Sequence, residues 1–344
     1  MPTYFSTFVP GTGEIVAKAL NERARAVDII GLWDGLVFYK SASDPDHVGG
    51  LRFLNNSFLL LRAFSKLGGD PITQMIHELL RDRSWRRPVA RHLPHGRARF
   101  RIIASRENVT TRVDLRLLRR LEVLVAVRPY LTVSVEHPDV ELWLVARREG
   151  AGFFGIRLAS SRGSRERLWS GELRPPLANL LCLVSEPARD DVFLDPFAGS
   201  GAIPLERASA FPFHRIIAVD SEPRLVEEIR RRAARRRGTA LSVVRDDALT
   251  LTSIPSVSVD KVVTDPPWGI YRQTQLPIDE FYKRMLDQFN RVLKRRGLAV
   301  LLIGNKAAFE GALGYFSAKF ELLVRYDVLV SGKKAAIYKI RKCE

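Results

Sequence analysis

Two short segments of the sequence carry residue types that could perform chemistry. The first runs from Val192 to Pro204 and reads VFLDPFAGSGAIP, so that an apolar run leads into a loop with two glycines. Glycine adopts backbone conformations that other residues avoid, and it lets a ligand approach the backbone closely. In an open α/β sheet, ligands bind at the carboxyl ends of the strands. We therefore predict a ligand-binding loop made of Asp195, Phe197, Ala198, Gly199, Ser200 and Gly201. A glycine turn that binds nothing is the alternative.

Acidic residues near this loop indicate which ligand it binds. Asp220 ends the next predicted strand about 20 residues after the glycines, where a carboxylate can accept hydrogen bonds from ribose hydroxyls. Pro204 stands where a dinucleotide-binding fingerprint needs a third glycine. Asp195 would repel a pyrophosphate but attract a cation. S-adenosylmethionine, which has a ribose, a sulfonium and an α-amine, is therefore the expected cofactor.

Three further residues are candidates for contacts with this cofactor. Ser221 follows Asp220 directly, and Asp246 and Asp247 follow the third predicted strand. The carboxylates of Asp246 and Asp247 could bind the adenine amine, but the same two residues could serve as a helix N-cap. Both interpretations of the pair stay open.

The second segment is Asp265-Pro266-Pro267-Trp268-Gly269, at the end of the fourth predicted strand. Two prolines stiffen the backbone, so that carbonyls there can act as fixed acceptors. The exocyclic amine of a base is a poor nucleophile because its lone pair is conjugated into the ring. Hydrogen bonds from its N–H groups to the Asp265 carboxylate and the Pro266 carbonyl would localise that lone pair. Trp268 would stack on the extruded base, an interaction worth ~1–3 kcal/mol. We predict that Asp265, Pro266, Pro267 and Trp268 are catalytic, and the alternative is a rigid turn.

The composition indicates a partner rather than a fold. The 344 residues carry a formal net charge of +17, which favours binding to a polyanion such as nucleic acid. The longest apolar runs are far shorter than the ~20 residues that cross a bilayer, and the N-terminus lacks the pattern of a secretory signal. We therefore expect a cytoplasmic protein without membrane contact. Two cysteines and scattered histidines offer no metal site.

The predicted elements divide the chain into three folded parts and a linker. Residues 1–66 have the strand, helix, strand, strand, helix, strand order of a ferredoxin-like domain, with the second helix near 51–56. Residues 67–158 mix strands and helices in a second α+β domain, and residues 159–174 form a linker rich in Ser, Gly and Arg. From 175 to 344, strands alternate with helices and two strands close the chain. This pattern predicts an α/β domain with a parallel, doubly wound sheet and a late hairpin.

Two basic segments could contact RNA. Residues 81–101 combine arginines with Trp85 and Phe100, and we favour RNA contact there because such a segment suits phosphates and stacked bases. Residues 230–237 hold six arginines on a predicted helix. RNA contact and a solvated outer face are equally compatible with that helix.

The two motifs together resemble a known family. DPFAGSG followed by TDPPWG, and the later GKKAAIYKI at 332–340, look like the Rossmann-like class I catalytic domain of THUMP-containing RNA guanine-N2 methyltransferases. Residues 4–16 resemble the start of that family's ferredoxin-like domain, and residues 100–158 are similar to its THUMP domain, which holds the acceptor end of tRNA. The chain departs from the family pattern at Ala198, Ala202 and Pro204. The resemblance implies cofactor contacts by Asp195, Gly199, Gly201, Asp220 and Asp247, and base contacts by residues 265–268.

By this resemblance we expect a monomeric enzyme that binds tRNA and forms N2-methylguanosine by direct methyl transfer. The alternatives are methylation of adenine N6 or of guanine N2 in ribosomal RNA, and a non-catalytic RNA-binding protein. In one class of DNA amino-methyltransferases the DPP motif comes first. Here the glycine motif precedes it, which argues against that class.

Overall fold

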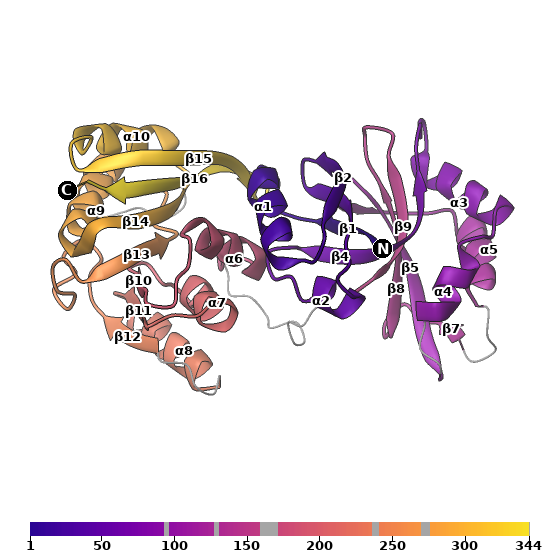
Figure 1. The fold of residues 1–344 in the computed structure, drawn as a ribbon, viewed down its shortest axis with the longest axis horizontal. Helices are drawn as coiled ribbons and strands as arrows, with labels where there is room; N and C mark the ends of the chain where they lie inside the picture. Colours follow the sequence, from indigo (N-terminus) through magenta and orange to yellow (C-terminus); the bar gives the residue numbers. More distant parts are fainter. Residues whose placement is uncertain (93–95, 127–130, 159–170, 236–240, 270–275, 344) are drawn as a thin grey trace. The chain divides into compact units, whose positions relative to one another are not determined.

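The computed structural model describes residues 1–92, 96–126, 131–158, 171–235, 241–269 and 276–343. These residues form two compact units, one drawn from 1–8 and 20–163 and the other from 9–19 and 164–344. Each unit contains one β-sheet with helices packed on it (Figure 1). Residues 159–170, the larger part of the predicted linker, lie outside the described residues.

The first unit is built on a sheet whose described strands follow the order β2-β3-β1-β4-β9-β8-β5-β6, with β7 paired to β5. The strands are β1 (Thr3–Thr7), β2 (Asp28–Trp33), β3 (Leu36–Lys40), β4 (Asn56–Phe64), β5 (Ala98–Arg106), β6 (Val109–Thr111), β7 (Leu131–Val133), β8 (Val140–Ala146) and β9 (Gly152–Arg157). The described helices between residues 1 and 158 are α1 (Gly13–Arg23), α2 (Pro45–Gly49), α3 (Pro71–Arg81), α4 (Arg86–His92) and α5 (Leu115–Val125). Residues 13–19 of α1 belong to the second unit. Because β4 pairs with β1 on one side and β9 on the other, strands from 1–66 and from 67–158 share one sheet.

The second helix of the ferredoxin-like part lies earlier than predicted. The structure has α2 at Pro45–Gly49, whereas the predicted helix near 51–56 is a turn that leads into β4. Asp44 caps α2 by accepting a hydrogen bond from the His47 N–H at 2.8 Å, and Pro45 occupies the first turn, where its missing N–H costs nothing. The apolar residues of 51–54 lie in this turn, where their side chains are buried without forming the stripe of a helix.

The aromatic residues of segment 81–101 lie in the core. Trp85 is 1% exposed, donates its indole N–H to the Leu79 carbonyl at 3.0 Å, and packs edge-on against Phe154. Phe100 is fully buried on β5. The prediction that these two rings stack on bases is therefore wrong. Arginines occur next to buried aromatic residues as well as next to exposed ones. The sequence pattern of residues 81–101 therefore did not distinguish core aromatic residues from base-stacking ones.

The second unit is a sheet whose described strands follow the order β12-β11-β10-β13-β14-β16-β15. The strands are β10 (Val192–Asp195), β11 (Arg215–Asp220), β12 (Leu241–Arg245), β13 (Val259–Thr264), β14 (Leu293–Ile303), β15 (Phe320–Val330) and β16 (Lys333–Lys342). Strands β10 to β14 pair in parallel, and β16 runs antiparallel between β14 and β15. The predicted doubly wound sheet with a late hairpin is thereby confirmed.

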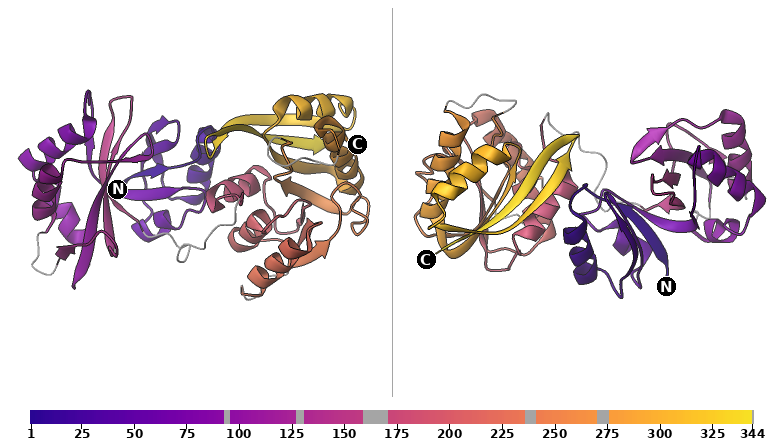
Figure 2. Two further views of the ribbon diagram at one scale, coloured as in Figure 1. Left: turned by 180° about the vertical axis from the view of Figure 1, so that it is seen from behind. Right: turned by 90° about the horizontal axis from the view of Figure 1, so that it is seen from above.

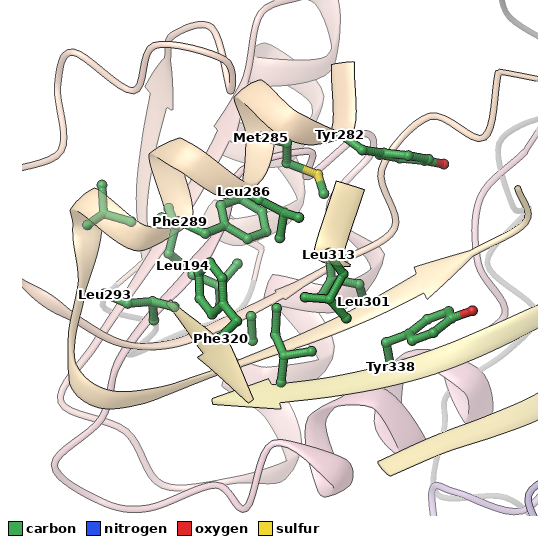
Figure 3. Packing of buried hydrophobic residues seen from close by; sticks show 14 of the residues in the cluster. Leu194, Tyr282, Met285, Leu286, Phe289, Leu293, Leu301, Leu313, Phe320 and Tyr338 are labelled. Atoms are coloured by element: carbon green, nitrogen blue, oxygen red, sulfur yellow. The ribbon is translucent and has the colours of Figure 1, made fainter. Parts of the chain in front are cut away.

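Helices cover both faces of this sheet (Figure 2). They are α6 (Pro175–Val184), α7 (Ala202–Ala210), α8 (Pro223–Ala234), α9 (Ile278–Val292) and α10 (Lys306–Tyr315). Helix α9 places Met285, Leu286 and Phe289 on one stripe, and these residues pack with Leu194 and Leu301 of the sheet (Figure 3). This core fixes the strands β10 and β14 on either side of β13. None of the described helices has the length and apolar character required to span a bilayer.

Candidate active site

The carboxyl ends of β10 and β13 lie side by side in the sheet of the second unit. Strand β10 pairs with β11 on one side and with β13 on the other. The chain proceeds outward from β10 through β11 and β12 and then returns to β13, so the order of the strands reverses here. Such a switch point is where doubly wound sheets bind ligands. Both predicted motifs begin at it, with Asp195 at the end of β10 and Asp265 directly after β13.

Asp195 connects the two motifs. The residue is 1% exposed, and its Oδ1 accepts hydrogen bonds from the Thr264 hydroxyl at 2.7 Å and the Phe197 N–H at 3.2 Å. Its Oδ2 is buried and has no hydrogen-bond partner within the described part of the chain. Burial, with smaller contributions from Asp220 and Asp265, raises the pKa of Asp195 to about 8. A buried carboxylate oxygen without a partner is costly, so a cationic ligand group would bind there favourably.

The loop after Asp195 depends on two left-handed glycines. Gly199 has φ +56° and Gly201 has φ +93°. Residues that carry a Cβ rarely adopt this left-handed region of backbone conformation. A Cβ on Gly201 would lie 3.0 Å from the Leu205 side chain, so this glycine is packed against its own helix. A Cβ on Gly199 would meet no described heavy atom within 4 Å apart from its chain neighbours. The backbone at Gly199 is therefore the part of the loop that a cofactor could approach.

Pro204 does not disturb the helix that follows. Helix α7 begins at Ala202 with Gly201 as its N-cap, and Pro204 lies in the first turn. The first four N–H groups of a helix have no partner within it, so a proline there removes no helical hydrogen bond. The departure from the family pattern at Pro204 is thus compatible with the motif.

Asp220 holds the glycine loop from the neighbouring strand. Its Oδ2 accepts a hydrogen bond from the Gly199 N–H at 2.9 Å, and its Oδ1 accepts one from the Glu222 N–H at 2.9 Å. A carboxylate has further lone pairs, so it can accept hydrogen bonds from ribose hydroxyls as well. Ser221 is exposed directly after it.

The adjacent residues Asp246 and Asp247 have different surroundings. The carboxylate of Asp246 accepts hydrogen bonds from the Asp247 N–H at 2.8 Å and from the Ser253 N–H and hydroxyl at 2.8 and 2.6 Å. Asp247 is exposed, and its Oδ1 accepts a hydrogen bond from the Leu249 N–H at 2.9 Å. Asp246 thus braces its own loop, which leaves Asp247 as the better placed of the two for an external amine.

The second motif is held by contacts on both sides of its prolines. The Trp268 indole N–H donates to the Asp265 carboxylate at 2.9 Å and to the Leu302 carbonyl at 3.2 Å. Trp268 and Asp265 are both partly exposed, while Pro266 is buried. Burial of its carboxylate raises the pKa of Asp265 to about 7, although the hydrogen bond from Trp268 opposes this shift.

Three residues that support the site were not identified from the sequence. Thr264 donates to Asp195, and the Tyr282 hydroxyl donates to the Pro267 carbonyl at 3.1 Å. Gly304, directly after β14, lies under the Trp268 ring, since a Cβ on it would be 2.2 Å from a ring carbon. Thr264 immediately precedes the DPPW motif, so its position was a signal, whereas the other two partners are distant in sequence.

Two observations test whether these residues fit S-adenosylmethionine. The Oδ2 of Asp195 is buried and has no hydrogen-bond partner among the described residues, so it suits an ammonium group. The open space beside Gly199 suits a ligand that lies across the loop. Both fit the expected cofactor. Within the described residues, no group of three or more His, Cys, Asp or Glu side chains is placed to hold a metal ion.

The topology of the second unit is that of the class I methyltransferase fold. The whole chain is similar to the crystal structure of TrmN from Thermus thermophilus, with a TM-score of 0.78 and 22% identity over 99% of this chain and 100% of the other. This similarity confirms the predicted fold class.

Sequence comparisons relate the second half of the chain to methyltransferases. Residues 162–325, just under half of the chain, match the UPF0020 family model, which is described as an RMKL-like methyltransferase domain. The tRNA (guanine(6)-N(2))-methyltransferase THUMP3 of Mus musculus is 30% identical over 49% of this chain and 36% of its own length. The tRNA (guanine(10)-N2)-dimethyltransferase of Methanothermobacter thermautotrophicus is 28% identical over 48% of this chain and 47% of its own length. The predicted relationship to tRNA guanine-N2 methyltransferases is confirmed, and the chain spans less than half the length of these curated relatives.

Proposed function

We propose that the protein is an S-adenosylmethionine-dependent RNA methyltransferase that forms N2-methylguanosine in tRNA. The observation that carries this proposal is the hydrogen bond from Thr264 to Asp195, because it joins the predicted cofactor loop to the predicted base-binding motif. The relatives named above modify guanine N2 of tRNA, which favours guanine over adenine as the target.

The ends of β10, β11 and β12 supply the proposed cofactor contacts. Asp195 Oδ2 offers an acceptor to the α-ammonium group, and the Gly199 backbone admits close approach. Asp220 accepts hydrogen bonds from the ribose hydroxyls, and Asp247 accepts one from the adenine amine. When bound, the cofactor supplies a methyl group made electrophilic by its sulfonium. Further proposed contacts are made by Phe197, Ala198, Ser200 and Ser221.

The residues after β13 supply the proposed contacts with the exocyclic amine of the target base. The Asp265 carboxylate and the Pro266 carbonyl accept hydrogen bonds from the two N–H groups, which localises the nitrogen lone pair toward the methyl carbon. Held in this way by Asp265 and Pro266, the nitrogen would face the methyl group of a donor bound at the glycine loop and could accept it. The pKa of Asp265, raised to about 7, suits it to accept the proton that the nitrogen then releases.

Trp268 supports the base in this arrangement. Its indole N–H is fixed by Asp265 and Leu302, and Gly304 lets the ring lie close to the end of β14. A ring that is already fixed loses little conformational freedom when a base packs against it. We therefore assign Trp268 the stacking contact with the extruded guanine.

The first unit is the proposed RNA-binding part. Helix α5 exposes Arg116, Arg119 and Arg120, whose charges can contact phosphates. We propose that residues 1–66 form the ferredoxin-like domain, 67–158 the THUMP-like RNA-binding domain, 159–174 the linker and 175–344 the methyltransferase domain. A monomeric state and a cytoplasmic location stay predictions from the sequence.

Transfer of a labelled methyl group tests this proposal. The protein is incubated with methyl-labelled S-adenosylmethionine and, separately, with bulk tRNA, ribosomal RNA and duplex DNA. We expect label in tRNA, and N2-methylguanosine after digestion to nucleosides. Recovery of N6-methyladenosine would replace the guanine assignment. Absence of label from every RNA, together with binding to RNA, would indicate a non-catalytic RNA-binding protein.

A further inference from the structure

Arg232 differs from its neighbours in the arginine-rich segment of α8. The Arg232 side chain is 13% exposed, whereas Arg230 and Arg231 are 53% and 48% exposed. Arg231 forms an ion pair with Glu228 of its own helix at 2.6 Å. Neither a solvated outer face nor a phosphate contact accounts for an arginine that is mostly buried.

The Arg232 guanidinium joins two segments that are distant in sequence. Its Nη1 donates to the Ser200 carbonyl at 2.8 Å and to the Glu172 carboxylate at 2.7 Å. The Glu172 side chain is 3% exposed, so the charges of this pair are shielded from water. Hydrogen bonds from a charged donor are stronger than neutral ones, and shielding strengthens them further.

Ser200 lies in a constrained part of the predicted cofactor loop. It lies between Gly199 and Gly201, both of which have left-handed backbones. Within the loop itself, the Gly201 N–H donates a hydrogen bond to the Ala198 carbonyl at 2.8 Å and closes the turn. From outside, Arg232 holds the Ser200 carbonyl. Asp220 accepts a hydrogen bond from the Gly199 N–H, so the peptide groups before Gly199 and after Ser200 are both anchored.

We infer that Arg232 is a positioning residue for cofactor binding. Through its hydrogen bond to Ser200, Arg232 keeps the glycine loop in its binding conformation and connects the loop to Glu172. This inference rests on the proposed function, because it deepens the role of the same loop. Without Arg232, the loop would sample other conformations, and the cofactor would have to restore the bound one. A lower population of the competent loop weakens apparent affinity in proportion.

Three variants of the full chain test this role: Arg232→Ala, Arg232→Lys and, as a matched control, Arg231→Ala. Calorimetry gives the Kd for S-adenosylmethionine, and steady-state transfer gives kcat and the KM values for cofactor and RNA. We expect Arg232→Ala to raise the cofactor Kd and KM by roughly tenfold, which corresponds to about 1.4 kcal/mol. The kcat at saturating cofactor and the KM for RNA stay within about twofold of wild type, since the loop still reaches its bound conformation.

The other two variants separate positioning from charge. Lysine can donate to the Ser200 carbonyl, so Arg232→Lys should recover part of the lost cofactor affinity, whereas Arg231→Ala should leave cofactor affinity unchanged. If Arg232→Ala does not fold, Glu172→Gln is used instead, and a severalfold rise in cofactor Kd is expected. Unchanged cofactor affinity in a folded Arg232→Ala or Glu172→Gln variant would overturn the inference, as would an effect confined to the KM for RNA. Failure of the wild-type protein to bind the cofactor would instead refute the proposed function.

Discussion

Two aspartates at neighbouring strand ends, Asp195 and Asp265, have raised pKa values for the same physical reason. Burial disfavours the charged form, and the pKa values rise from 3.8 to about 8 and about 7 respectively. Among the described residues, the buried Oδ2 of Asp195 has no hydrogen-bond partner. A cationic cofactor group would stabilise the ionised form, so cofactor binding and deprotonation of Asp195 should favour each other.

The pH dependence of stability follows from Asp195. A carboxyl group whose pKa is raised in the folded state makes a contribution to stability that is complete below its unfolded pKa and is lost as pH rises through its folded pKa. We expect the ligand-free protein to lose stability between about pH 4 and pH 8 from this group. Urea unfolding of wild type and Asp195→Asn across this range should show a shallower loss in the variant. The exposed Asp190→Asn serves as control, and parallel curves for all three proteins would contradict this account.

At the residue scale, the sequence predicted what depends on short spacing. The junction of an apolar strand with a glycine loop located Asp195, and the proline pair located Asp265. The role of Asp246 could not be predicted, because its partner Ser253 is brought back to it by a loop. Arg232 could not be predicted either, since Ser200 lies on another element.

At the scale of elements, the end of β14 determines where Trp268 can lie. The ring is fixed at its N–H by Asp265 and Leu302. A Cβ on Gly304 would lie 2.2 Å from one ring carbon and 2.3 Å from another. The absence of a side chain at Gly304 is therefore a condition for this position of the ring.

Gly304→Ala should displace the Trp268 indole and break its hydrogen bond to Asp265. We expect methyl transfer to fall by more than about tenfold, because a misplaced contact near the reacting group is costly, while cofactor Kd stays near wild type. Tryptophan fluorescence would report the displacement. Gly314→Ala is the matched control, since a Cβ there meets nothing within 4 Å. Wild-type transfer by Gly304→Ala would show that the position of the ring is not required.

Element types were predicted best where the period of apolar residues was clear. The alternating pattern of strands and helices in the sequence after residue 175 predicted the parallel strands and the late hairpin where the structure has them. The helix predicted near 51–56 was wrong because a capped turn at Asp44 starts a helix earlier. The pairing of β4 with β9 joins strands far apart in sequence, and no local pattern indicates such a pairing.

At the scale of the whole molecule, the net charge of +17 favours association with RNA but does not locate it. Burial of Trp85 and Phe100 removes the aromatic part of the predicted patch at 81–101. The exposed arginines of α5 are a defined alternative, because three of them lie within two turns of one helix.

Replacing Arg116, Arg119 and Arg120 by alanine should weaken tRNA binding and reduce its dependence on salt. Each phosphate contact with single-stranded or duplex nucleic acid contributes about 0.7–0.9 to the slope of log K against log salt concentration. We expect the slope to become shallower by about 2, with kcat at saturating tRNA unchanged. Titrations at several salt concentrations measure this, with Arg284→Ala of α9 as the control. An unchanged slope would place the RNA contacts on other residues.

The central claim is that Asp265 and its proline-stiffened loop hold an exocyclic amine in front of a bound methyl donor. Nucleoside mass spectrometry of tRNA treated with a trideuteromethyl cofactor and either wild type or Asp265→Asn tests it most directly. We predict that wild type places the label on guanine N2, and that Asp265→Asn binds the cofactor normally but transfers ~10²–10³-fold more slowly. Label on a ring nitrogen, a ring carbon or the ribose, or a wild-type rate in the variant, would contradict the account.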